Sequence, residues 1–184
     1  MRVRAFRPGD EAELAQIFFS AVHEVASARY SPRQVKAWAP EMPSAEQFAV
    51  RAADGRAVFV AVDEQDRPLP YGDLEPDGHT DNLYCRPAST GAGVAAAVYE
   101  AIEAAAWRSR IGLLFVEASE PARRFFLKRG FELVARRDFK LDGVPVHNIR
   151  MEKRLARPGT RRPDVPHWHA GACRGAGPGP DRCH

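Results

Sequence analysis

Cysteine is scarce in this chain of 184 residues, and its three cysteines, Cys85, Cys173 and Cys183, are odd in number and far apart. Such a set excludes a disulfide framework, and a reducing cytoplasm is the simplest compartment for it. Long apolar runs are also lacking, and none approaches the roughly 20 residues that cross a bilayer. The first residues lead directly into Pro8-Gly9-Asp10 without an apolar segment, so we expect no secretory signal. We therefore expect a cytoplasmic protein with no membrane partner.

Charge is unevenly distributed along the chain. The formal net charge is +3, but residues 154–184 carry six arginines and two aspartates, so that segment has a charge of +4 and residues 1–153 have −1. The same segment holds five prolines and five glycines and shows no periodicity of apolar residues. Such a composition is typical of disordered chain. We predict one globular domain over residues 1–153 and a disordered tail over 154–184.

Apolar periodicity and turn residues predict a mixed α/β fold for the globular part. Strands are predicted at 3–6, 58–62, 71–74, 80–85, 113–118, 132–139 and 146–153. Helices are predicted from an apolar stripe between Leu14 and Val25, at 32–39, from the N-cap Ser44 onward, at about 93–107 and at 120–128. The early strands form antiparallel neighbours, and one parallel crossover comes late in the chain.

The segment from Leu83 to Ala95 is the most informative in the sequence. It combines a short strand, a turn and a small-residue loop that opens directly into a helix. The free N–H groups at a helix N-terminus bind phosphate without basic side chains, and glycines such as Gly91 and Gly93 let a ligand approach the main chain. The alternative is a tight turn in which the glycines only relieve crowding, and the loop alone leaves both interpretations open.

Taken with its surroundings, this loop resembles the GNAT superfamily of acyl-CoA-dependent N-acetyltransferases. The acyl-CoA signature of that family is Gln or Arg, two residues, Gly, one residue, and Gly or Ala. The matching window here is Thr90-Gly91-Ala92-Gly93-Val94-Ala95, in which Gly93 and Ala95 agree and Thr90 departs. A second match runs from Glu117-Ala118-Ser119 to Gly130-Phe131, and the order of elements agrees from Met1 to about Lys153. The resemblance implies a mixed, mostly antiparallel sheet with splayed parallel strands and flanking helices.

The resemblance also implies acetyl-CoA as a cosubstrate, with no metal. The pantetheine arm would insert between the splayed strands like an additional strand, and the glycine loop would hold the pyrophosphate. The residues expected at the cofactor are Leu83, Tyr84, Cys85, Thr90, Gly91, Ala92, Gly93, Val94, Ala95, Ser119 and Phe126.

The reaction implied is direct transfer of the acetyl group to a primary amine in a ternary complex, which requires a proton acceptor. Period-two alternation directs Asp81 and Glu117 toward the expected splay, so both are candidate bases. The alternative is that Asp81 caps a hairpin and Glu117 pairs with a core arginine. Many family members have a tyrosine at the position of Phe126, where it protonates the leaving thiolate. Phenylalanine has no such proton, so we leave the acid unassigned.

The acceptor pocket is expected near the first two helices. Tyr30 and Trp38 would form an aromatic wall, and Glu24 or Asp73 would attract a cationic acceptor. The alternative is that both aromatic residues simply pack in the core. The sequence does not identify the acceptor, which we expect to be a small-molecule or peptide amine, and it allows a monomer or a homodimer.

Two rival functions remain on the sequence alone. One is a non-catalytic module of the same fold that binds acyl-CoA, which the departures at Thr90, Ala92 and Phe126 would suit. The other assigns the tail arginines to nucleic acid, but a solvated extension is favoured because Trp168 is the only aromatic among them. The histidines and cysteines of the tail have no spacing that indicates a zinc site.

Overall fold

A computed structural model of the protein describes residues 1–89 and 93–155, so residues 90–92 and residues 156–184 of the predicted tail lie outside the described residues. The strands are β1 (Arg2–Ala5), β2 (Ala57–Val62), β3 (Pro68–Leu74), β4 (Leu83–Cys85), β5 (Leu113–Ala118), β6 (Glu132–Leu141) and β7 (Val144–Arg154). The α-helices are α1 (Glu11–Ser20), α2 (Pro32–Trp38), α3 (Ala45–Ala52), α4 (Val94–Arg108) and α5 (Glu120–Lys128). Among the described residues, no helix is both long enough and apolar enough to span a membrane.

The strands form two antiparallel sheets, in the orders β1-β2-β3-β4 and β5-β7-β6. A short parallel bridge between His79 and Phe115 joins them. There the N–H of Thr80 donates to the carbonyl of Phe115 at 3.0 Å, and the N–H of Phe115 donates to the carbonyl of Gly78 at 3.1 Å. Beyond this bridge, within the described part of the chain, β4 pairs only with β3, and β5 only with β7. The predicted mixed α/β fold with splayed parallel strands is confirmed.

Gly78 allows the two sheets to approach each other at this junction. Its φ is +97°, and a Cβ at this position would lie 2.1 Å from the carbonyl oxygen of Leu113. Only a residue without a side chain can adopt that dihedral angle and also fit against the backbone of β5.

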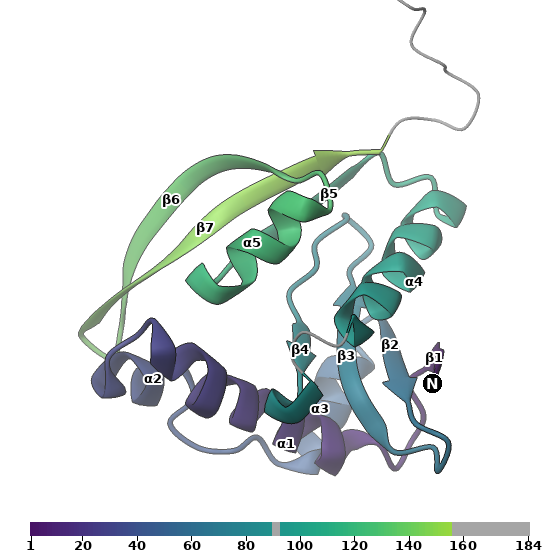
Figure 1. The fold of residues 1–184 in the computed structure, drawn as a ribbon, viewed down its shortest axis with the longest axis horizontal. Coiled ribbons are helices and arrows are strands. Elements are labelled where there is room, and N and C mark those ends of the chain that lie inside the picture. The colour runs from purple at the N-terminus through teal and green to yellow at the C-terminus, as the bar shows by residue number, and fades with distance from the viewer. Residues whose placement is uncertain (90–92, 156–184) are drawn as a thin grey trace, which may run out of the picture.

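Different helices cover the two faces of the structure (Figure 1). α4 and α5 pack on the strands of both sheets in a core that includes Val98, Ile102, Val116 and Met151. α1 and α3 cover the opposite face of the first sheet, where Leu14 and Ile17 meet the apolar side chains of β2. The outer end of the β6–β7 hairpin reaches α2, where the amide of Gln34 donates to the carbonyl of Pro145. The splay between β4 and β5 therefore lies where the helical layers meet.

The helix predicted through Val25 changes character at Ser20. The α-helix ends there, a π-helical segment covers Ala21–Val25, and a 3-10 turn follows over Ala26–Ala28. The Ser20 hydroxyl donates to the carbonyl of Gln16 at 2.7 Å, and such bonds within a helix often bend it. π-Helical segments are frequent at functional sites, and this one contributes apolar side chains to the cavity described below.

An ion pair between Arg4 and Asp10 ties the first strand to the start of α1. Their side chains are 7% and 10% exposed, and two bonds of 2.7 and 2.9 Å join them. Burial raises the pKa of Asp10, but the hydrogen bonds from Arg4 and from the N–H of Arg7 lower it further, so the pKa lies below its ordinary value. The pair therefore stabilises the fold above the ordinary pKa of an aspartate, and this contribution is lost as the pH falls through the lowered pKa.

We predict that Asp10→Asn lowers the free energy of unfolding at pH 7 by about 2 kcal/mol, because the buried guanidinium of Arg4 loses its two-bond partner and keeps the more exposed Asp66. The loss should shrink as the pH falls below about 4. Urea unfolding at pH 7 and at about pH 3 measures both effects. Asp66→Asn, at a side chain that also contacts Arg4 but is 41% exposed, is the control and should cost less than about 1 kcal/mol. A loss for Asp10→Asn that is equal at both pH values contradicts this interpretation.

Candidate functional site

A cavity of about 460 Å³ lies between β4 and β5, immediately beyond the bridge that joins the sheets. Its walls come from both diverging strands, from the π-helical segment, from α2 and from α5. In the described residues β4 is the edge strand of its sheet. The main-chain N–H and C=O groups of β4 that face the cavity therefore have no partner in a neighbouring strand. An extended, hydrogen-bonding ligand could therefore lie along β4 in this opening.

Most of the residues expected at a cofactor surround this cavity. Those that line it are Leu83, Tyr84, Cys85, Gly93, Ala95, Ser119 and Phe126. Val94 begins α4 but is not part of the lining, and Thr90, Gly91 and Ala92 lie outside the described residues. Gly93 is the N-cap residue of α4, with a φ of +76°, and it also lines the cavity. The positive end of the α4 dipole therefore lies at the edge of the cavity.

Phe126 and Tyr84, the two aromatic residues expected at the cofactor, are poor candidates for the acid. Phe126 is 4% exposed and packs edge-on against Phe131 and Phe125, at centroid distances of 5.1 and 5.4 Å. The nearby phenol of Tyr84 packs edge-on against Phe18 at 5.0 Å. Burial raises the pKa of Tyr84 well above its ordinary value, which makes it a poor proton donor.

Asp81 lines the cavity, and a buried network holds it from behind. Its carboxylate forms ion pairs with Arg51 and Arg56. Asp73, which is 1% exposed, accepts hydrogen bonds from the N–H groups of Asp81 and Asn82 at 2.9 and 2.8 Å, and Arg56 donates to it at 2.6 Å. Asp73 was expected to attract the acceptor, but the structure places it beneath the cavity wall. Its contacts instead fix the backbone at Asp81.

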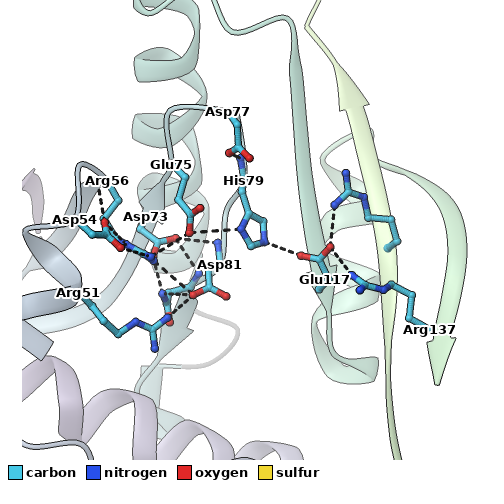
Figure 2. Close-up of polar contacts among 12 residues, drawn as sticks. Arg51, Asp54, Arg56, Asp73, Glu75, Asp77, His79, Asp81, Glu117 and Arg137 are labelled. Carbon is cyan, nitrogen blue, oxygen red and sulfur yellow. Dashed lines mark hydrogen bonds and ion pairs between the residues drawn. The ribbon is translucent and has the colours of Figure 1, made fainter. Parts of the chain in front are cut away.

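Glu117 faces the cavity from β5, where two guanidinium groups and an imidazole surround it (Figure 2). Arg150 and Arg137 donate to Oε1 at 2.8 and 3.0 Å, and Nε2 of His79 lies 2.6 Å from Oε2. Burial raises the pKa of Glu117, but the hydrogen bond from Arg150 and the contact with His79 lower it further, so the pKa lies below its ordinary value. The two interpretations of Glu117 are therefore compatible, because it pairs with an arginine and also lines the cavity.

No motif or spacing in the sequence singled out His79, Arg137 and Arg150. They come from a turn and from two later strands, and only strand pairing over 20 to 38 residues brings them to Glu117. The one available signal was the polar alternation of Arg150 and Glu152 in β7, a strand that is otherwise largely buried.

Tyr30 and Trp38 line the cavity and also pack against other aromatic rings. Their centroids are 6.1 Å apart, and Trp38 lies 6.1 Å from Phe139 of β6. The Tyr30 hydroxyl accepts a hydrogen bond of 3.0 Å from the N–H of Glu120, in the first turn of α5. Tyr30 therefore caps a helix at the cavity wall, which is a structural role in addition to the predicted contact with an acceptor.

Comparison with known proteins agrees with this geometry. A family model described as "Acetyltransferase (GNAT) domain" matches residues 26–155. The "Uncharacterized N-acetyltransferase YafP" of Escherichia coli (strain K12) is 30% identical over 152 residues, which are 82% of this chain and 94% of that protein. A GCN5-related N-acetyltransferase from Rhodopseudomonas palustris has a solved structure with a TM-score of 0.76 and 32% identity, covering 84% of this chain and 95% of that one.

A more distant structure, YncA of Salmonella typhimurium with its cofactor acetyl-CoA, has a TM-score of 0.65 and 18% identity. The match covers 90% of this chain and 98% of that one, and at this identity it shows the shared fold alone.

Proposed function

This chain belongs to the GNAT family of acetyltransferases, and we propose that it moves the acetyl group of acetyl-CoA directly to a primary amine in a ternary complex. The observation that carries the proposal is the cavity between β4 and β5, which opens where the sheets separate and meets the N-terminus of α4 at its edge. Its shape and lining suit a thioester arm on one side and an amine on the other.

In the proposed complex the pantetheine arm lies along β4, whose main-chain groups at Leu83 and Cys85 pair with its amides. The pyrophosphate lies at the N-terminus of α4, near Gly93, where the helix dipole favours negative charge. Ser119 and Phe126 contact the arm from the side of β5 and α5. Each of these five residues lines the cavity.

The amine enters beside Glu117, with the aromatic wall of Tyr30 and Trp38 behind it. Because the pKa of Glu117 is lowered, its carboxylate is ionised at neutral pH and can accept the proton that the attacking nitrogen loses. Asp81, which precedes β4, places a second carboxylate at the cavity, and the two carboxylates together favour a small-molecule or peptide amine as the acceptor. The coenzyme A thiolate leaves without a proton from position 126.

The test is amine-dependent release of coenzyme A from acetyl-CoA, followed with a thiol reagent over a panel of primary amines. The proposal predicts stoichiometric N-acetylated product, identified by mass spectrometry. It also predicts that acetyl-CoA slows alkylation of Cys85, which lines the cavity, as followed on the peptide that contains this residue. Protection of Cys85 without release of coenzyme A for any amine would instead favour a non-catalytic module that binds acyl-CoA.

A further inference from the structure

The least expected contact at the site joins His79 to Glu117 across the junction of the two sheets. We infer that His79 is a positioning residue for proton transfer: it takes from Glu117 the proton that the amine loses and passes it toward solvent, away from acetyl-CoA. This inference rests on the proposed function, because it assigns the onward path of the proton that the acetylation releases. The distance of 2.6 Å between Nε2 of His79 and Oε2 of Glu117 is short enough for direct transfer.

One ring contact, one contact to the partner ring and one hydrogen bond from the backbone N–H hold His79 in place. The ring stacks on Phe115 with a centroid distance of 4.8 Å and an interplanar angle of 11°. The guanidinium of Arg150, from the strand on the other side of β5, lies 3.7 Å from the centroid of the same Phe115 ring. The N–H of His79 donates to the carboxylate of Asp77 at 3.0 Å. A histidine held in this way keeps Nε2 aimed at Glu117, as a positioning residue requires.

The second nitrogen of the ring provides the onward path. Nδ1 of His79 lies 3.5 Å from the carboxylate of Glu75, whose side chain is 27% exposed (Figure 2). Glu117 lines the cavity, whereas His79 and Glu75 do not. The order Glu117, His79, Glu75 therefore leads from the cavity to the surface without crossing the space that the thioester arm would occupy.

Glu117 alone would hold the proton of the amine only weakly, so a second group is needed to accept it, and His79 is in contact with Glu117. A carboxylate with a lowered pKa returns a proton readily, while imidazole is the side chain whose ordinary pKa lies closest to neutrality. As the nitrogen–carbon bond forms, the carbon–sulfur bond breaks and the sulfur leaves with its electron pair. The proton of the amine moves to Oε2 of Glu117 and on to Nε2 of a neutral His79 whose hydrogen is on Nδ1, while Nδ1 releases that hydrogen toward Glu75.

The charges around His79 come from every neighbouring segment. Glu75 and Asp77 lie on the connection that precedes β4, and Glu117 lies on β5. Arg150 and Arg137 approach from β7 and β6 through Glu117, and Arg56 reaches Glu75 at 3.1 Å. The rate should therefore follow the protonation of the Glu117–His79 pair as a unit rather than that of either residue alone.

The test is the pH profile of kcat for His79→Gln beside the parent, with an amine that the parent acetylates. We expect kcat to fall by about 10- to 100-fold, the acid limb to move to lower pH, and imidazole in the buffer to restore part of the rate. KM for acetyl-CoA should remain within about twofold of the parent value, which shows that the fold and the cofactor site are intact. His23→Gln, the same change at a histidine outside the cavity lining, should keep both kcat and the acid limb.

Two outcomes overturn the inference. One is a His79→Gln enzyme with the kcat and the profile of the parent. The other is a lower kcat with an unmoved acid limb and no rescue by imidazole, which would mark a structural role only. If the parent enzyme shows no amine-dependent release of coenzyme A, the proposed function is contradicted, and so is the relay that rests on it.

A second measurement needs no amine. The ring nitrogens of His79 can be titrated by ¹⁵N NMR in the parent and in Glu117→Gln. The relay predicts that the substitution alters the titration of His79 and leaves that of His23, which contacts Phe19 and the carbonyl of Ala39 instead, in place. Identical titration curves for His79 in the two proteins would overturn the proton sharing.

Discussion

Glu117→Gln is expected to lower kcat for amine acetylation by about 100- to 1,000-fold, while KM for acetyl-CoA stays within about threefold. The amide keeps the size of the side chain and can still accept hydrogen bonds from Arg150 and Arg137. It has no negative charge, so it does not take a proton from the attacking amine. Steady-state kinetics with an amine that the parent acetylates, at saturating acetyl-CoA, measures the loss.

Two companion variants separate the chemical role of Glu117 from its role in the network. Glu152→Gln removes another carboxylate that contacts Arg150, at 3.2 Å, but lies outside the cavity, and it should keep kcat within about twofold. Asp81→Asn should lower kcat less than Glu117→Gln does, because Arg51 and Arg56 already hold the Asp81 carboxylate. If Glu117→Gln retains the kcat of the parent, the proton acceptor lies elsewhere.

Gly78→Ala is expected to lower the free energy of unfolding by about 3 kcal/mol or more, the largest stability effect that we predict. The added Cβ would lie 2.1 Å from the carbonyl oxygen of Leu113, an atom of the backbone that has little freedom to move. The backbone would also retain a φ of +97°, which side chains disfavour. Because Gly78 lies in the bridge that joins the sheets, coenzyme A binding should weaken together with stability.

The chain offers a matched control for this substitution in Gly55. Its φ is +101°, nearly the same, but a Cβ at this position would meet nothing within 4 Å. Gly55→Ala should therefore show the cost of the dihedral angle alone, about 1 kcal/mol. Urea unfolding of the two variants measures the difference, which reports the close approach at the junction. Equal losses for the two alanines would mean that the contact between the sheets does not depend on Gly78.

Local sequence signals predicted the elements well because each element has its own chemistry. Ser31 and Ser44 were expected to begin helices, and both form capping boxes in the structure. The turn at 141–143 was expected to join a final antiparallel pair, and β6 and β7 pair there. The π-helical segment after Ser20 was not predicted, because an apolar stripe has nearly the same spacing in either type of helix.

Long-range pairing explains what the sequence did not show. Alternation along single strands directed Asp81 and Glu117 toward the splay, and the structure places both at the cavity. The contact of His79 with Glu117 depends on which strand lies beside β5, and that information is spread over the whole fold. The position of Asp73 also depends on the whole fold. Its charge suggested a carboxylate that faces a ligand, but the fold buries it, and it accepts a hydrogen bond from the backbone of Asp81.

The most direct measurement of the central claim is a crystal structure of the protein with coenzyme A bound. We expect the pantetheine arm in the opening between β4 and β5, hydrogen-bonded to the main chain of β4, with the sulfur on the side of the cavity that Glu117 faces. Coenzyme A bound outside this opening, or with its sulfur directed away from Glu117, would contradict the account.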